Sequence, residues 1–221
     1  MKLEKYNYRF AVLCALFTMV FVGMEAFGQL RRAQAAPSAK QEKNNIKIER
    51  MPPPNKTAMI RTPEFNARVQ NTMPPVTRKP REWALFEVKY STSATWTDEL
   101  TFNYYVMTQG KDDKGDEIFN FYTTTVRYID IPKGDHMSCV AIAPSQIERY
   151  GAPVSLALEI IDKEGEVADR KSESTIPFPN EEWWKDSTVL DNPKVKRREG
   201  LVDRSKTPFA LINIDDYEVV Q

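Results

Sequence analysis

The sequence predicts an all-β protein: an immunoglobulin-like β-sandwich preceded by a signal segment and a proline-rich linker. Three observations support this fold class. Apolar and polar residues alternate with period two from Trp83 onward, glycine-containing polar turns separate the alternating segments, and more than half of the 15 prolines lie upstream of them. A chain of 221 residues with 11% aromatic residues is long enough for one such domain with a packed core.

The N-terminus has the pattern of an export signal. A basic start (Lys2, Lys5, Arg9) precedes an apolar run at residues 10–24. The small residues of Ala26-Phe27-Gly28 then predict cleavage, so we expect a signal peptide over residues 1–28. Cleavage after residue 35, at Ala33-Gln34-Ala35, and an uncleaved membrane anchor are the alternatives. Glu25 ends the apolar run below the ~20 residues of a membrane-spanning helix, which favours cleavage.

Residues 29–82 read as a proline-rich linker. Eight prolines fall in this stretch, and because proline lacks an amide hydrogen they disfavour both helices and central strands. Residues 36–82 hold ten basic and four acidic residues, whereas residues 83–221 hold 16 basic and 25 acidic ones. A basic leader therefore precedes an acidic body, and we expect no nucleic-acid partner because the body repels phosphate.

Residues 83–176 form the predicted sandwich. Alternating segments begin at Ala84, Leu100, Ile118, Ser138 and Val154, and a hairpin at Asp162–Gly165 leads into residues 167–174. We count about seven strands, which suits an immunoglobulin-like sandwich, although the Cys…Trp…Cys pattern of antibody domains is absent. Between strands, Ser145 and Glu148 have the spacing of a capping box, and Gly151 follows as a helix stop.

Residues 177–221 are predicted to be a C-terminal extension with a terminal strand. Trp183 and Trp184 read as a plug over one end of the core. The residues from Pro208 to Ile214 and from Tyr217 to Val220 are strand-like after a charged stretch. An apolar terminal strand requires burial, so it either returns to the edge of its own sheet or adds to the sheet edge of a partner protein.

The chemistry-bearing residues do not form a catalytic or metal-binding pattern. After cleavage the chain keeps one histidine, His136, and one cysteine, Cys139, on a predicted strand. We interpret His136 as a solvated residue at the start of the strand and Cys139 as a buried structural thiol. The acidic turn after Lys111 lacks the residue order of an EF-hand. We therefore predict a protein that is not an enzyme and has no cofactor and no metal.

The dense aromatic residues offer binding surfaces. Trp96 and Tyr105 fall outside the core-facing series. They either pack against neighbouring strands or the linker, or form an exposed patch that binds sugar or protein. Tyr122 is a further candidate for sugar binding. The predicted partner-binding residues come from the terminal strand and from this patch: Phe209, Leu211, Ile212, Tyr217, Trp96 and Tyr105.

In layout, the chain resembles a family of small exported immunoglobulin-like proteins. The residues that carry the resemblance are the run Lys206-Thr207-Pro208-Phe209-Ala210-Leu211 and the terminal Asp216-Tyr217-Glu218. Proteins of this family are encoded with type IV pilus and secretin components in verrucomicrobial-type bacteria. The resemblance implies an envelope protein without catalysis. Because the segment before the apolar run lacks the glycine of a prepilin leader, it implies an accessory component rather than a pilin subunit.

These observations lead to one functional prediction and one alternative. We predict a non-enzymatic cell-envelope protein with an immunoglobulin-like interaction module, accessory to type IV pilus assembly or a related secretion system. Its expected partners are envelope, pilus or secretin proteins, and its expected location is the periplasm, outer membrane or cell surface. Contact with the membrane would come only through an uncleaved signal segment. The alternative is a surface carbohydrate-binding or adhesion module.

Overall fold

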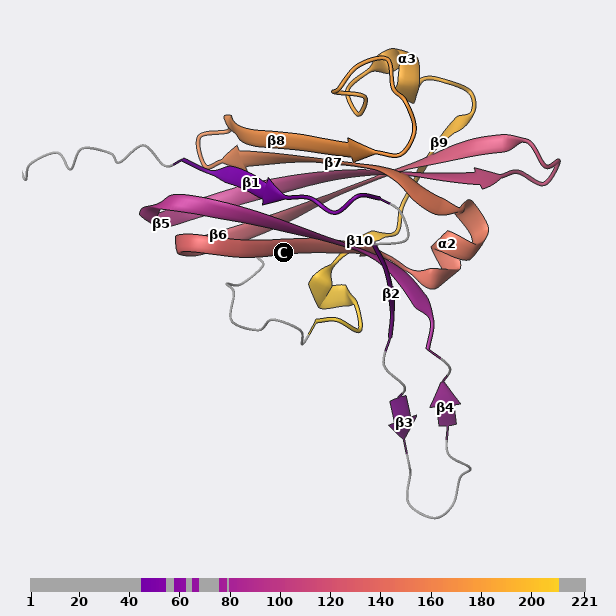
Figure 1. Ribbon diagram of the computed structural model, residues 1–221, viewed down its shortest axis with the longest axis horizontal. Helices are drawn as coiled ribbons and strands as arrows, with labels where there is room; N and C mark the ends of the chain where they lie inside the picture. Colours follow the sequence, from indigo (N-terminus) through magenta and orange to yellow (C-terminus); the bar gives the residue numbers. More distant parts are fainter. Residues whose placement is uncertain (1–44, 55–57, 63–64, 68–75, 79, 211–221) are drawn as a thin grey trace, which may run out of the picture. The chain divides into compact units, whose positions relative to one another are not determined.

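The regular structure of this protein is almost entirely β-strand, as predicted (Figure 1). The computed structural model describes residues 45–54, 58–62, 65–67, 76–78 and 80–210. The predicted signal segment lies outside these residues, as do the last eleven residues of the chain. Most strands belong to one hydrogen-bonded sheet with the order β10-β6-β5-β7-β8, which β1, β2 and β9 join at its borders.

Two very long strands form the frame of the molecule. β5 (Glu82–Lys111) and β6 (Glu117–Ile142) pair antiparallel as one hairpin, from Ala84 opposite Ile142 to Lys111 opposite Glu117. At its tip, the Asp112 carboxylate accepts hydrogen bonds from the backbone amides of Lys114 and Asp116, both at 2.9 Å. The acidic stretch that resembles a calcium loop is therefore a hairpin turn stabilised by its own aspartate.

The long hairpin folds over on itself, and this bend creates the sandwich. The register between β5 and β6 shifts between Thr92 and Trp96. On β6, Asp130 and Gly134 have φ angles of 53° and 143°, which turn the strand. The two halves of β5 then face each other, because the rings of Tyr90 and Phe102 lie 4.8 Å apart. The all-β sandwich is thus confirmed, but one bent hairpin supplies both of its layers.

We call the two layers layer 1 and layer 2. Layer 1 contains residues 82–92 of β5, residues 134–142 of β6, and the short strands β1 (Lys47–Arg50), β2 (Met59–Arg61) and β10 (Leu201–Asp203). Layer 2 contains residues 96–111 of β5, residues 117–132 of β6, and the strands β7 (Ala152–Asp162), β8 (Val167–Ser174) and β9 (Val195–Arg198).

Part of the predicted linker belongs to the sheet. β1 and β2 both pair with β5, and Ile48 and Met51 are buried, so the predicted domain boundary at Trp83 is too late. The proline run that follows Met51 lies between these two strands rather than within them, which is where proline does not cost a sheet hydrogen bond.

A second pair of short strands continues this region. β3 (Phe65–Ala67) and β4 (Val76–Arg78) pair antiparallel in a two-stranded sheet of their own. Met59 pairs with Ala84. Phe65, six residues after Met59, pairs with Arg78, six residues before Ala84. The two strand pairs therefore share one register.

The predicted hairpin at Asp162–Gly165 joins β7 to β8. The Asp162 carboxylate accepts hydrogen bonds from the amides of Glu164 and Glu166, and Gly165 takes a φ of 86°. This turn is confirmed, with glycine at the position that needs a positive φ.

The short helices start differently from the prediction. α2 (Pro144–Tyr150) begins after Ala143, which makes no side-chain cap, and Pro144 occupies the first turn. The predicted capping box of Ser145 is therefore wrong: the helix starts at Pro144, two residues earlier than a Ser145 cap requires, because proline is favoured in the first turn. Gly151 ends the helix as predicted, with a φ of 91°. The residues that the structure describes contain two further short helices, α3 (Ser187–Leu190) and the 3₁₀ turn η2 (Arg204–Lys206).

The core lies between the two layers and consists of aliphatic and aromatic side chains. The hydroxyls of Tyr104 and Tyr128 both donate to Ser138 Oγ, at 2.7 and 2.9 Å, and so join layer 2 to layer 1 inside it. The largest members of this core with little or no exposure are Tyr90, Tyr104, Tyr122, Phe86, Phe102, Leu100, Ile131, Ile142 and Leu156.

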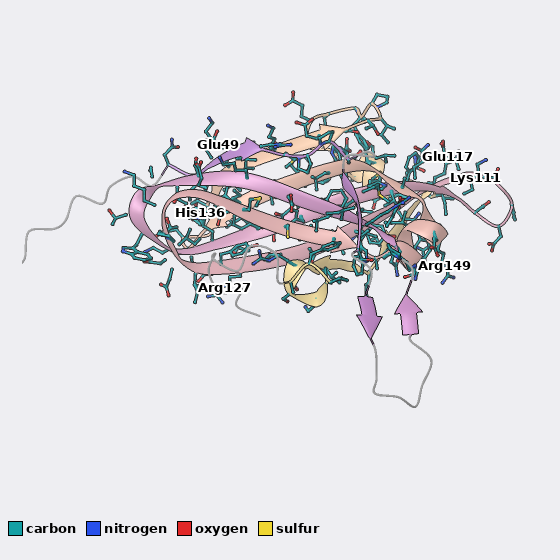
Figure 2. The ribbon with its side chains drawn as sticks, turned by 60° about the horizontal axis from the view of Figure 1, so that its bottom comes forward. Glu49, Lys111, Glu117, Arg127, His136 and Arg149 are labelled. Carbon is teal, nitrogen blue, oxygen red and sulfur yellow. The ribbon has the colours of Figure 1, made fainter. Side chains whose placement is uncertain are left out.

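His136 is part of this core at the bend, contrary to the prediction of a solvated residue. Only 5% of it is exposed, its Nε2 lies 2.8 Å from the Pro132 carbonyl oxygen, and its ring packs beside Tyr90. Figure 2 places His136 and Arg127 at one end of the sandwich, away from Lys111 and Glu117 at the hairpin tip. The bend points His136 inward, and the turn at Gly134 gave no sequence signal of this burial.

Candidate interaction surfaces

The structure separates the predicted partner-binding residues. Leu211, Ile212 and Tyr217 lie outside the described residues. Phe209, Trp96 and Tyr105 are described, but they occupy three different places: the outer face of layer 1, the bend, and the outer face of layer 2. They do not form one patch.

Phe209 covers the outer face of layer 1. It is 2% exposed, packs with Leu85, Cys139 and Ala141, and meets Trp83 edge-on at 6.0 Å. A turn places it there, because Thr207 Oγ1 accepts from the amide of Phe209 at 3.1 Å. In this structure Phe209 therefore binds its own sheet.

Cys139 lies under Phe209. It is a free cysteine with 8% exposure, and burial raises the pKa of its thiol to about 12. The guanidinium of Arg204 lowers this pKa, while Glu87 and Asp203 raise it, and burial is the largest of these effects. The predicted buried structural thiol is confirmed, and the raised pKa keeps it in the unreactive thiol form at neutral pH.

Trp183 and Trp184 cover the outer face of layer 2. They are 1% and 4% exposed, and they pack against Met107, Phe121 and Ala157. Trp183 stacks on Phe178 at 4.9 Å and meets Phe121 edge-on at 6.1 Å. The predicted plug is real, but it covers the face of a sheet rather than one end of the core. It is the counterpart of Phe209 on the other layer.

Tyr105 lies under this tryptophan pair. Its ring stacks at 6.0 Å from Trp184 and at 6.3 Å from Phe121, so it does not form the predicted exposed patch. Its hydroxyl donates to Glu159 at 3.3 Å. Burial, together with the charge and hydrogen bond of Glu159, raises the pKa of Tyr105 to about 12.

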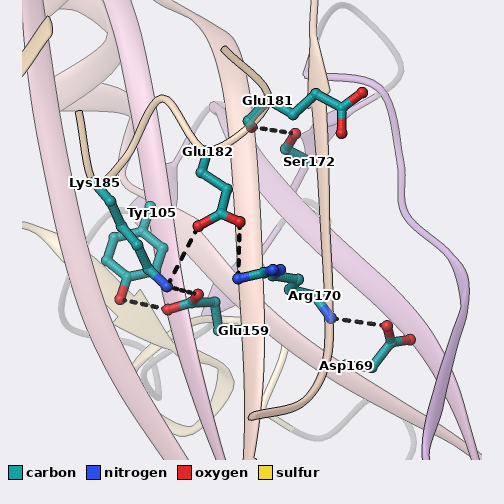
Figure 3. Close-up of polar contacts among 8 residues, drawn as sticks. All are labelled: Tyr105, Glu159, Asp169, Arg170, Ser172, Glu181, Glu182 and Lys185. Carbon is teal, nitrogen blue, oxygen red and sulfur yellow. Dashed lines mark hydrogen bonds and ion pairs between the residues drawn. The ribbon is translucent and has the colours of Figure 1, made fainter.

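A buried carboxylate anchors the tryptophan pair to the sheet (Figure 3). Glu159 of β7 is 4% exposed, and it forms an ion pair with Lys185, one residue after Trp184. Lys185 also meets Glu182 at 3.7 Å, and Glu182 meets Arg170 of β8 at 2.8 Å. We call Tyr105, Glu159, Arg170, Glu182 and Lys185 the Glu159 cluster. A buried carboxylate is costly unless it is paired, so the cluster fixes where the segment crosses the sheet.

An open depression of about 790 Å³ borders the Glu159 cluster. Its walls carry cationic side chains (Arg170, Lys171, Lys185) and carboxylates (Glu181, Glu182, Asp186) in equal number. Most of these charges are already engaged: Asp186 caps α3 through the amide of Thr188, and Arg170 and Lys185 pair with Glu182. The depression therefore has no surplus charge with which to select a charged ligand.

Trp96 is the most exposed large hydrophobic side chain among the described residues, at 63%. It lies at the bend, where it pairs with Pro132 of β6. Beside it on β5, Thr97 is buried, and Asp98 forms a 2.6 Å ion pair with Lys163. Trp96 is thus a tryptophan ring presented from a paired strand and flanked by charged residues.

The remaining predicted binding residue, Tyr122, is fully buried in the core. It cannot contribute to an exposed sugar-binding surface. Within the described ranges no group of three or more His, Cys, Asp or Glu residues is placed to hold a metal ion. In the same ranges no helix is long and apolar enough to cross a membrane.

Comparisons with known proteins place the chain in a family and show its fold in a solved structure. No curated protein matches. A solved structure, the crystal structure of a protein from Akkermansia muciniphila, matches with a TM-score of 0.60 and 19% identity over 81% of this chain and 94% of that chain. The fold is thus shared with a verrucomicrobial protein. A protein-family model matches residues 37–221, so this chain belongs to the family which that model describes.

Proposed function

We propose that this chain is an exported, non-enzymatic protein of the cell envelope. Its immunoglobulin-like sandwich would bind another envelope protein as an accessory to type IV pilus assembly or a related secretion system. The N-terminal export pattern and the resemblance carried by the Lys206–Leu211 run support this role. The fold shared with a verrucomicrobial protein agrees with the resemblance.

The observation that carries the proposal is the exposure of Trp96. Tryptophan is enriched among the residues that dominate protein interfaces, because it buries a large area and loses little side-chain entropy on binding. Trp96 is 63% exposed, yet its backbone is held by pairing with Pro132. The neighbouring Asp98–Lys163 ion pair supplies the polar rim typical of an interface.

The test is a Trp96→Ala variant in the native envelope. After crosslinking, affinity purification and mass spectrometry, the wild-type chain should enrich secretin, pilin or pilus-assembly proteins. The variant should lose this enrichment by about tenfold or more, as removal of an interface hot spot predicts. Val167→Ala is the matched control, because Val167 is also an exposed apolar residue, at 45%, on the β7–β8 hairpin.

Two outcomes would contradict the proposal. If the wild-type chain is recovered alone, it has no stable envelope partner. If Trp96→Ala retains the same partners as the Val167→Ala control, Trp96 does not bind them. Folding does not confuse the result, because substitution of an exposed residue changes stability by about 0.5 kcal/mol or less.

A surface carbohydrate-binding module is the second candidate, and the exposed ring of Trp96 favours it as well. Of the three aromatic residues considered for sugar binding, Tyr122 is buried and Tyr105 lies under Trp184. One ring therefore remains for stacking on a sugar. A glycan array that shows binding by the wild-type chain, and none by Trp96→Ala, would favour this candidate over a protein partner.

A further inference from the structure

β9 carries cationic side chains that no carboxylate of the described chain neutralises. We give the name basic strip to five residues: Lys194, Lys196, Arg197, Arg198 and, in the last turn of α2, Arg149. None of them forms an ion pair within the described residues, whereas most of the other described lysines and arginines do. Residues 83–221 hold 25 acidic and 16 basic residues, so this unpaired positive charge differs in sign from the body around it.

The fold holds Arg198 of the basic strip in one position. Its Nε donates to Oδ1 of the buried Asn120 at 3.0 Å, and its guanidinium lies 4.3 Å from the centre of the Tyr150 ring. Asn120 is fixed in turn, because its amide group donates to the Tyr150 carbonyl at 3.0 Å. The Arg149 guanidinium lies 5.2 Å from the same ring. Two guanidinium groups beside one ring favour a nearby anion, and a side chain that is already held loses little entropy when it binds one.

One side of β9 is open to a further strand. β9 pairs in parallel with residues 119–122 of β6 and with no other described strand. The Phe119 amide donates to the Lys194 carbonyl at 2.9 Å. Because backbone groups alternate along a paired strand, those of Lys196 also point to β6, and those of Arg197 point away from it. The amide and carbonyl of Arg197 can therefore pair with a strand on the outer side of β9.

The side chains of β9 alternate between two faces, and cations occur on both. Val195 packs with the tryptophan pair on the outer face of layer 2, and Arg197 shares that face. Lys196 and Arg198 point to the opposite face. A flat membrane surface contacts the cations of one face, whereas an added strand presents its alternate side chains to both faces. The arrangement therefore favours an extended polypeptide over a lipid surface.

We propose that the basic strip is a docking site for an acidic, extended segment of another protein, which adds to β9 as a further strand. The backbone of this segment pairs with Arg197. Its alternate carboxylates meet Lys196 and Arg198 on one face and Arg197 on the other. Charged side chains on a sheet edge discourage unspecific pairing, so the positive charge of β9 selects an acidic strand over basic or apolar ones.

The basic strip is separate from the Trp96 surface. Figure 2 places Arg149 at the end of the sandwich that holds Lys111 and Glu117. Trp96 lies at the bend, where β5 and β6 turn over. A chain with both surfaces can hold two partners at once, one at each end, which goes beyond the single partner of the proposed function.

Binding of a synthetic peptide to the protein tests the docking site. The probe is a short fluorescein-labelled peptide in which Glu alternates with Thr, and fluorescence anisotropy measures its affinity. Arg197→Glu and Lys196→Glu should each weaken binding by about tenfold, because each replaces an attraction with a repulsion. Lys133→Glu is the matched control: it makes the same change of net charge at an exposed lysine beside the bend and should leave the affinity unchanged. All three residues are exposed, so the variants should fold as the wild type does, which urea denaturation checks.

Hydrogen exchange followed by NMR tests whether the peptide adds as a strand. Saturating peptide should slow the exchange of the Arg197 amide by about tenfold or more, because this amide points away from β6. The Lys196 amide points to β6 with or without peptide and is the internal control. A peptide of the same composition with its Glu residues in one block should bind more weakly, since only alternation places carboxylates on both faces.

Three results would overturn the proposal. The first is no measurable peptide binding by the wild type, or equal affinity of Arg197→Glu and Lys133→Glu for the peptide. The second is binding to phosphatidylglycerol vesicles that Arg197→Glu abolishes while peptide binding is absent, which would assign the basic strip to a membrane. The third is self-association in sedimentation that Arg197→Glu abolishes, which would assign it to a second copy. None of these results involves Trp96, so this proposal stands or fails separately from the proposed function.

Discussion

The two outer faces of the sandwich are closed by the same part of the chain in two different ways. On layer 2, Trp183 and Trp184 lie on the sheet and are tied to it through the buried Glu159 and Lys185. On layer 1, a single ring, Phe209, covers Leu85, Cys139 and Ala141, and the hydrogen bonds of the Thr207 hydroxyl place it there. The residues after β8 are therefore part of the fold and not an appendage to it.

The difference between the two covers concerns geometry as well as area. The apolar contacts of the two tryptophan rings with the sheet are not directional, and the Glu159 cluster gives the pair one fixed position because a buried carboxylate requires its partner. Phe209 fills a smaller space and is positioned by the Thr207 hydroxyl, which donates to the Arg204 carbonyl and accepts from the Phe209 amide. We expect the layer 2 cover to contribute more to stability, and the layer 1 cover to be the easier one to open.

The largest effect is expected from Trp183→Ala. Removal of a buried tryptophan ring costs about 3–5 kcal/mol, and Trp183 is 1% exposed between Phe121 and Phe178. Urea denaturation measures the change in the free energy of unfolding. Trp96→Ala removes the same ring from an exposed position and should change it by about 0.5 kcal/mol or less. A loss below about 1 kcal/mol for Trp183→Ala would mean that the cover is dispensable.

Phe209→Ala should cost about 3 kcal/mol, at the lower end for a buried phenylalanine, because it covers one small face. It should also lower the pKa of the Cys139 thiol from about 12 toward its usual value of 9.0. In the wild type, this raised pKa contributes stability that is present below pH 9 and lost as pH rises through about 12.

Thiol reactivity and urea denaturation, each measured from pH 8 to 12, check both consequences of Phe209→Ala. The variant should react with a thiol reagent at lower pH than the wild type and lose less stability over this range. Phe209→Leu, which keeps an apolar cover, should react as the wild type does. Unchanged reactivity in Phe209→Ala would show that Phe209 does not seal Cys139.

The smallest of the three effects is expected from Lys185→Met. This change leaves the buried Glu159 without its cation and should cost about 1–3 kcal/mol. Lys171→Met is the matched control: its ion pair with Glu173, at 4.0 Å, lies on the surface and contributes less than about 1 kcal/mol. If both variants lose the same stability, the Glu159 cluster does not anchor the cover.

Much of the sheet could be predicted from local pattern. Val88 and Phe102 belong to alternating segments whose inward side chains do meet in the core, and the Asp162–Gly165 turn forms the expected hairpin. The predicted strand count was less accurate, because the bend near Thr92 interrupts the alternation of apolar and polar residues but does not end β5. β1 was not predicted, because prolines lie close to it in the sequence; in the structure they lie outside the strand. Glu159 gave no sequence signal, since a charged residue on an alternating strand normally faces water.

The sequence by itself determined the all-β class, the main turns and the burial of Cys139, because alternation, glycine and side-chain hydrophobicity act over a few residues. Only the tertiary structure decided which faces are covered. Trp184 lies over Tyr105, Phe209 lies over Cys139 and His136 turns inward, since each of these contacts depends on where the bent hairpin brings residues far apart in the chain. Trp96 is left uncovered by the same bend, and no local pattern could distinguish it from the tryptophans that are buried.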